Sequence, residues 1–305
     1  MEKFTNWRDA ATGISPFMPI PNSNSGKGAV KYLLGPVRLL AFAVRGLFLV
    51  LLLALYILSV PVAPLQKLVL GLLLELVFGV IETEVQIDGI KRSNTKLTKV
   101  NRPNKRDLVI ANLSSPLDPL ALACISNSSI SSCLFLIPDG AGDLRSYSVW
   151  GAFKFALSDP VTAHQGEIIH DVAKFKNKTL FVFPESTTSN NKAILPFNPK
   201  LGKLSDLMGE NTFKLKAIST KSYPPQLTTT PLPTSVITFL WTSLSHLKFE
   251  TRFKSKVFLL ESESTWKEAR TALTNYGKLN LVGNSLNLQA KIAFIAAFKK
   301  GKGIS

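Results

Sequence analysis

The hydrophobic and polar positions divide the chain of 305 residues into three parts. Residues 1–28 are polar and interrupted by prolines, and they lack the apolar core and cleavage site of a secretory signal. Residues 29–82 are strongly apolar, whereas residues 83–305 alternate short apolar runs with amphipathic stretches. We therefore predict a polar cytosolic segment at 1–28, a membrane anchor at 29–82 and an α/β domain at 83–305.

The predicted anchor contains a run as long as a membrane-crossing helix. Residues 46–65 carry no charge, and roughly 20 such residues cross a bilayer. Four basic residues precede the run and place the N-terminus in the cytosol: Lys27, Lys31, Arg38 and Arg45. Prolines then interrupt the segment, and the second apolar run, residues 68–81, is short for an independent span.

These features leave two arrangements of the anchor open. One is a single span followed by a helix in the interface, and the other is a helical hairpin that enters and leaves by the cytosolic face. The hairpin is favoured because it returns the basic domain that follows to the cytosol. A buried core helix is the alternative for a soluble protein, although so long an uncharged run is unusual there.

Beyond residue 82 the pattern predicts a mixed sheet flanked by helices. Continuous apolar runs at 107–112 and 179–183 suit central strands that are buried on both faces. Other strands are expected at 84–90, 132–137, 213–219 and 235–240. Helices are expected at 119–126, 148–158, 168–175, 264–276 and 286–298.

Polar loops follow the two predicted central strands. The first runs from Asn112 to Asp118, and the second is Phe183-Pro184-Glu185-Ser186-Thr187. Ligands of α/β sheets bind beyond the carboxyl ends of the strands. We therefore expect the two loops to form one crevice, open toward lipid, with the carboxyl groups of Asp118 and Glu185 on the same side.

Charge and cysteine content narrow the class of protein. The net charge of +16 and the pI of about 9.8 favour an anionic partner, either nucleic acid or an anionic membrane leaflet. Zinc-finger spacing and aromatic RNA-binding strands are absent from the sequence, so the membrane is favoured. Cys124 and Cys133 are too few for a disulfide framework and suit a reducing compartment. No zinc spacing, glycine-rich phosphate loop or dinucleotide fingerprint occurs, so neither a metal nor a bound cofactor is predicted.

The two loops resemble the motifs of the glycerolipid acyltransferases, the lysophosphatidate and glycerol-3-phosphate acyltransferase superfamily. That family carries Asn-His-X4-Asp after a strand, then Phe-Pro-Glu-Gly-Thr-Arg-Ser, then a Leu-Pro-Phe stretch. The matching segments here are 112–118, 183–189 and 195–197, and the resemblance covers roughly residues 80–240. Residues 1–9 and 12–17 also resemble fungal members from the endoplasmic reticulum and lipid droplets.

The resemblance implies a role for Asp118 beside the catalytic base, but the histidine position is Leu113, which cannot accept a proton. Asp118 could be the base if burial raised its pKa, with Ser114 as a donor. His164 or His170 could instead supply a histidine. The residues expected to bind substrate are Asn112, Phe183, Pro184, Glu185, Ser186, Thr187 and Lys192.

A second departure concerns the cation of the second motif. Its arginine, which meets the phosphate of the acceptor, corresponds to Thr188, and its glycine corresponds to Ser186. We expect Lys192 to substitute as a point charge, with Arg145 as a further contributor.

The resemblance implies a membrane-bound acyltransferase that moves an acyl group, expected to be oleoyl, from acyl-CoA to lysophosphatidate. Its partners would be acyl-CoA as cosubstrate, lysophosphatidate and anionic membrane lipid, with no nucleic acid and no obligate protein partner. Its place would be the endoplasmic reticulum membrane and the lipid droplet, with the α/β domain facing the cytosol. Two alternatives remain: a non-catalytic lipid-binding or lipid-droplet protein of the same fold, and an acyltransferase for another lysophospholipid.

Overall fold

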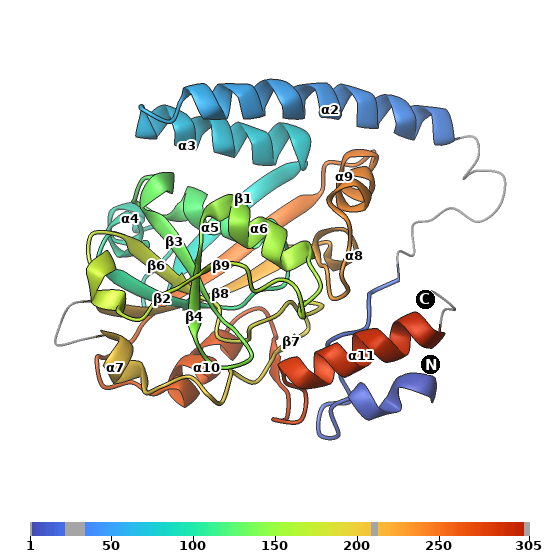
Figure 1. Ribbon diagram of the computed structural model, residues 1–305. Helices are drawn as coiled ribbons and strands as arrows, with labels where there is room; N and C mark the ends of the chain where they lie inside the picture. The colour runs from blue at the N-terminus through green and yellow to red at the C-terminus, as the bar shows by residue number, and fades with distance from the viewer. Residues whose placement is uncertain (1, 22–33, 209–212, 302–305) are drawn as a thin grey trace.

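The computed structural model describes residues 2–21, 34–208 and 213–301. Its centre is an eight-stranded mixed sheet with helices on both faces (Figure 1). In spatial order the strands are β1 (Val80–Ile87), β9 (Thr251–Leu259), β8 (Lys214–Tyr223), β2 (Asp107–Ala111), β6 (Thr179–Val182), β3 (Cys133–Pro138), β4 (Leu144–Tyr147) and β5 (Glu167–Ile168). The short strands β7 (Ala193–Ile194) and β10 (Asn280–Leu281) pair separately. The predicted fold class, a mixed sheet flanked by helices, is confirmed.

The central strands β2 and β6 are parallel and buried on both faces. Val109 and Phe181 belong to one hydrophobic core, whereas Leu108 and Leu180 belong to the other. This alternation explains why the two strands form continuous apolar runs in the sequence.

Different helices cover the two faces (Figure 1). The first core includes α2 (Gly35–Leu58), α3 (Ala63–Leu72), the π-helix η2 (Leu73–Val77), α5 (Asp118–Ile125), α6 (Val149–Leu157) and α9 (Val236–Leu244). The second includes η4 (Val172–Phe175), α7 (Leu204–Met208) and α10 (Trp266–Thr274). The remaining elements are η1 (Glu2–Trp7), α4 (Thr95–Asn101), η3 (Ile130–Ser132), α8 (Pro225–Thr228) and α11 (Leu288–Gly301).

The apolar helix α2 lies across the top of the domain with α3 beneath it (Figure 1). Both halves of α2 contact the α/β part, because Phe42 packs on Trp241 of α9 at 5.0 Å between ring centroids and Tyr56 packs on Trp150 of α6 at 5.7 Å. Arg45, inside the apolar helix, is buried and donates hydrogen bonds to carbonyl groups at the end of α9. In the described part of the chain α2 is the one helix that is long and apolar enough to cross a membrane, judged by length and composition.

The bounds of the apolar segment differ from the prediction. The first helix spans Gly35–Leu58 instead of residues 46–65, and it ends early because Pro61 cannot continue a helix. The second run, predicted at 68–81, divides into α3, η2 and the start of β1, and the chain turns at Gly79 with φ of 67°. Lys27, Lys31 and the predicted boundary at residue 28 lie outside the described residues.

The N-terminal segment and the C-terminal helix pack on each other. Phe4, Trp7 and Phe17 surround Phe294 of α11, with ring centroids 5.5–5.8 Å apart. The backbone N–H of Asn190, in the loop that follows β6, donates to the carbonyl oxygen of Pro16 at 2.9 Å. Segments from both ends of the chain therefore lie against the second predicted site loop.

Candidate functional site

The two predicted loops leave the same edge of the sheet and are joined directly. Strands β2 and β6 are parallel neighbours with Ile110 opposite Val182, so their carboxyl ends lie together. The backbone N–H of Ser189 donates to the carbonyl oxygen of Leu113 at 3.2 Å. The residues that follow α8 connect to both loops: the N–H of Thr230 donates to Ser114, and its carbonyl accepts from the Thr188 hydroxyl at 2.6 Å.

Asp118 is the first residue of α5 and is fully buried. Its Oδ2 accepts hydrogen bonds from the N–H groups of Ser114 and Ser115, both at 2.8 Å, and from the Ser114 hydroxyl at 3.1 Å. Its Oδ1 is buried without a hydrogen-bond partner. Burial raises the pKa of Asp118 to about 7, although the three hydrogen bonds oppose the rise. The side chain therefore holds its loop through one oxygen and keeps the other free for a proton.

Glu185 and Ser186 follow β6 and line a cavity of about 120 Å³. Both carboxyl oxygens of Glu185 and the hydroxyl of Ser186 are buried without a hydrogen-bond partner, and the N–H of Leu195 faces the carboxyl without ordinary hydrogen-bond geometry. Burial raises the pKa of Glu185 well above its ordinary value, and the carboxyl of Asp118 adds to the rise. Ser186 has φ of 58°, a conformation that favours glycine.

Two cations that the sequence analysis did not assign lie near Glu185 and lower its pKa. Arg270 of α10 donates to the carbonyl oxygens of Ile194, Leu195 and Val282 at 2.7–3.1 Å. Lys291 of α11 is 1% exposed, and its Nζ donates to the backbone carbonyl and hydroxyl oxygens of Thr188. Burial lowers the pKa of Lys291 to about 7.

Of the other predicted substrate-binding residues, four are buried and Lys192 is exposed. The side-chain amide of Asn112 donates to Thr220 of β8 at 2.9 Å and accepts from its N–H at 2.8 Å, which is a structural role. Phe183, Pro184 and Thr187 are buried, and Phe183 stacks on Phe135. Lys192 is exposed and lines a separate cavity beside residues 13–21.

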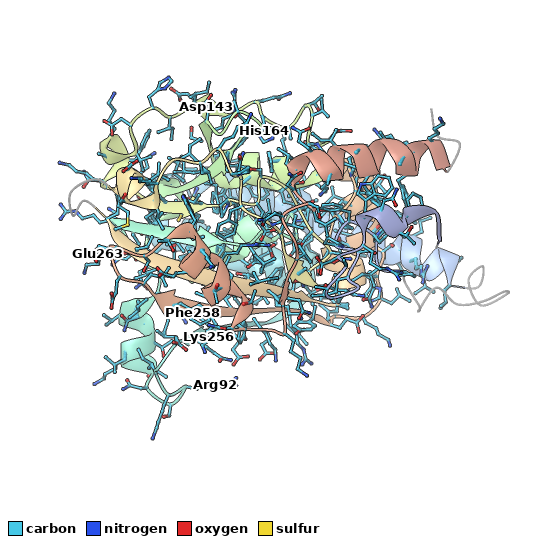
Figure 2. All side chains as sticks on the ribbon, turned by 90° about the horizontal axis from the view of Figure 1, so that it is seen from below. Arg92, Asp143, His164, Lys256, Phe258 and Glu263 are labelled. Carbon is cyan, nitrogen blue, oxygen red and sulfur yellow. The ribbon has the colours of Figure 1, made fainter. Side chains whose placement is uncertain are left out.

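The structure does not bring the predicted alternative histidine or arginine to Asp118. His164, labelled in Figure 2, packs against Phe155 with the ring centroids 5.2 Å apart, and the charges of Asp139 and Arg145 act on its pKa in opposite directions. Burial lowers its pKa, and both ring nitrogens lack a hydrogen-bond partner. Arg145 pairs with Asp139 at 2.9 Å and donates to the carbonyl oxygen of Gly166. His170 is exposed.

Residues 2–21, 34–208 and 213–301 contain no cluster of three or more histidine, cysteine, aspartate or glutamate side chains suited to a metal ion. The polar groups beyond the carboxyl ends of β2 and β6 include the buried carboxyls of Asp118 and Glu185, serine hydroxyls, and the cations of the α10 and α11 side chains described above. This set is suited to binding an anionic substrate and moving a proton.

Two curated proteins align with the chain along nearly its whole length. A Saccharomyces cerevisiae protein named lysophosphatidic acid:oleoyl-CoA acyltransferase 1 is 26% identical over 307 residues, which cover 98% of this chain and 97% of the yeast protein. The chain is a relative of this fungal protein. A Schizosaccharomyces pombe protein, provisionally named for the same activity, is 25% identical over 314 residues, with 98% and 99% covered. The resemblance to fungal acyltransferases is thereby confirmed, whereas no family model and no solved structure matches the chain.

Proposed function

We propose that this protein is a membrane-bound acyltransferase that moves an acyl group, preferentially oleoyl, from acyl-CoA to lysophosphatidate. The product would be phosphatidate, used in phospholipid and triacylglycerol synthesis. The observation that carries the proposal is the near-full-length similarity to two yeast proteins named for this activity. The geometry supports it, because the two motif loops leave neighbouring strands and are joined by the hydrogen bond from Ser189 to Leu113.

In this proposal Asp118 accepts the proton of the acceptor hydroxyl. The hydroxyl oxygen bonds to the thioester carbon, the carbon–sulfur bond breaks, and the departing thiolate takes the proton back. Two features support the role of Asp118: an Oδ1 with no hydrogen-bond partner, and a pKa of about 7, close to that of an efficient general base. Ser114 holds the other oxygen and supplies a hydroxyl donor.

Glu185 and Ser186 would hold the acceptor, because they contribute unpartnered polar atoms to the cavity. Acyl-CoA is a cosubstrate in this scheme, and neither a metal nor a bound cofactor takes part.

In this proposal the protein lies on the cytosolic face of the endoplasmic reticulum and on lipid droplets, held by a hairpin of α2 and α3. Contacts at both halves of α2 with the α/β part argue against a single crossing, since a helix crossing about 30 Å of hydrocarbon would carry one end away from that domain. The hairpin would therefore be shallow, with both ends of α2 held against the domain. Exposed apolar side chains of α2 and α9 would contact lipid: Leu40, Leu47, Val50, Ile57, Leu58, Ile237 and Trp241.

The activity is tested with the purified full-length protein in phosphatidylcholine vesicles, given labelled oleoyl-CoA and lysophosphatidate. We expect labelled phosphatidate from the wild type and from Asp206→Asn, an exposed carboxyl of α7. Asp118→Asn should reduce kcat at least about 100-fold, because a general base contributes roughly 10²–10⁴-fold. Equal rates for Asp118→Asn and the wild type would exclude Asp118 as the base.

Leu113 favours a second candidate, a lipid-binding protein without catalysis, because the motif's histidine is absent. The same assay distinguishes the candidates. Vesicle binding without any acylated product supports the non-catalytic protein, and product only from lysophosphatidylcholine or lysophosphatidylinositol supports another acceptor.

The membrane arrangement is tested by protease digestion of intact microsomes. Tags on both termini should be removed if α2 and α3 form a hairpin, whereas a protected tag on one terminus would indicate a single crossing.

A further inference from the structure

The C-terminal helix α11 forms one wall of the cavity at Glu185, although it lies outside the segment that carries the motifs. Residues 287–289, at the start of α11, line the cavity together with Glu185, Ser186 and Lys200. The cavity therefore joins a loop that follows β6 to a helix about 100 residues later in the chain.

The start of α11 offers groups that bind anions. The first N–H groups of a helix have no acceptor within the helix, and the helix dipole adds partial positive charge there. Asn287 accepts from the N–H of Ala290 at 3.1 Å and from that of Lys291 at 3.0 Å, which fixes this turn. Anions bind readily at such helix starts.

Buried polar atoms in the same cavity independently indicate a ligand. Glu185 is 2% exposed and Ser186 is fully buried, yet the carboxyl and hydroxyl oxygens lack hydrogen-bond partners. Leaving such groups without partners is unfavourable, so a ligand that pairs with them is stabilised. Because burial raises the pKa of Glu185, its carboxyl can be protonated and donate to an anion.

Lys291 places a buried cation near Glu185, which lines this cavity. Its Nζ binds Thr188, two residues after Ser186, and lies 6.0 Å from the centre of the Phe17 ring. Within the described part of the chain, no ion pair joins Lys291 to a carboxylate. A buried ammonium without a paired anion is costly, and an anion in the cavity would offset that cost.

We propose that the first turn of α11 and Lys291 complete a binding site for a phosphomonoester group beside Glu185 and Ser186. This inference rests on the proposed function, in which both lysophosphatidate and coenzyme A carry such a group. A volume of about 120 Å³ suits a single headgroup rather than a nucleotide, so the site is assigned to lysophosphatidate.

The site also couples binding to protonation. The pKa of Lys291 is about 7, because burial lowers it while Glu185 and Asp159 oppose the change. A bound phosphate would raise that pKa again, so binding takes up a proton and weakens as the pH rises above about 7.

The kinetic test uses full-length protein in vesicles and measures KM for each substrate. Lys291→Met removes the cation and should raise KM for lysophosphatidate at least about 10-fold, which corresponds to about 1.4 kcal/mol. KM for oleoyl-CoA should stay within about 2-fold. Lys291→Arg keeps the positive charge and should recover part of the loss. The matched control is Lys300→Met, an exposed lysine on the same helix.

A second variant guards against misfolding of Lys291→Met. Gln289 is exposed at the rim of the cavity, and Gln289→Glu introduces a charge that suits the helix start but repels phosphate. We expect it to raise KM for lysophosphatidate without lowering Tm. Equal changes in both KM values, or none in either variant, would overturn the proposal; a rise for oleoyl-CoA alone would assign the site to coenzyme A.

Direct binding separates this inference from the proposed function. Calorimetry with sn-glycerol 3-phosphate should detect binding to the wild type that is weaker at pH 8.5 than at pH 6.5 and absent in Lys291→Met. If the wild type makes no phosphatidate but shows this binding, the activity is wrong and the site stands. Activity together with binding that does not depend on Lys291 refutes the site alone.

Discussion

Replacing Asp118 with asparagine should change the pH dependence of stability in a way that reports the protonation of this buried carboxyl. In the folded protein burial raises the pKa of Asp118 from 3.8 to about 7. The folded state therefore binds the proton more tightly than the unfolded state does. The stability that this carboxyl contributes is fully present below about pH 4 and is lost as the pH rises through about 7.

The magnitude follows from the size of the pKa rise. At about 1.4 kcal/mol per pH unit, a rise from 3.8 to about 7 corresponds to a loss of about 4 kcal/mol between pH 4 and pH 8. Asparagine still accepts from the N–H groups of Ser114 and Ser115, but its amide N–H groups are buried without partners at a cost of about 1–3 kcal/mol. The stability of Asp118→Asn relative to the wild type should thus rise by about 3 kcal/mol from pH 5 to pH 8, and the variant should be the more stable protein at pH 8.

The assay is thermal unfolding of both proteins in the same detergent at pH 5 and pH 8. Each kcal/mol corresponds to roughly 2–4 °C in Tm for a domain of this size, so this change in the Tm difference is measurable. The control Asp206→Asn should follow the wild type at both pH values. A Tm difference of the same sign and size at pH 5 and pH 8 would refute the raised pKa.

Three further variants test the surroundings of the site. Asn112→Ala removes both hydrogen bonds to the Thr220 backbone and should cost about 2–4 kcal/mol of stability, measured by denaturation. Ser186→Gly relieves the φ of 58° and should raise stability by up to about 1 kcal/mol; a loss of activity in this stable variant would show that the hydroxyl contacts substrate. Ile237→Asp, at a side chain 77% exposed on α9, should weaken flotation with lipid vesicles, and unchanged flotation would separate α9 from the membrane surface.

The elements that carry the site could be predicted because their local signals agree with the fold. The apolar runs of β2 and β6 reflect burial on both faces, and the loops that follow them begin where polar residues and proline end each strand. Helix α10 has a capping box formed by Thr265 and Glu268. Such signals act within a few residues and survive in the tertiary structure.

Elements shaped by distant contacts were predicted wrongly or missed. Residues 235–240 were expected to form a strand because they contain β-branched residues, but they begin helix α9, which Ser235 caps through Thr238. Tertiary packing overrides such weak preferences, and α9 packs on α2 through Trp241. Strand β9 alternates buried and exposed residues and was missed, although its period of two is a strand signal.

Lys291 shows a limit of motif-based reasoning about the site. The cation was expected close to the motif in sequence, at Lys192, which is exposed beside a separate cavity. The lysine that binds Thr188 of the motif is Lys291, from a helix outside the segment that carries the motifs. A local signal did exist: Lys291, Phe294 and Ile295 share the i, i+3, i+4 spacing of the buried face of α11. A lysine at a core position is rare unless its charge is used, which is a usable criterion for such helices.

The protonation states that the site requires predict a bell-shaped pH profile for kcat/KM. Asp118 must be ionised to accept the hydroxyl proton, whereas Lys291 must be protonated to bind phosphate, and the pKa of each is about 7. Activity should therefore rise and fall within a narrow range around pH 7. Lys291→Arg, whose guanidinium stays charged, should remove the alkaline limb and leave the acidic limb in place.

The acidic limb belongs to Asp118 rather than to Glu185. Because the carboxyl of Asp118 adds to the rise in the pKa of Glu185, we expect Glu185 to stay protonated while Asp118 ionises. Glu185→Gln should then lower activity while leaving the acidic limb near pH 7. The matched change Asp118→Asn should remove that limb together with most of the activity. If the limb instead disappears in Glu185→Gln and persists in Asp118→Asn, the proton acceptor is Glu185, and the division of roles between the two loops must be reversed.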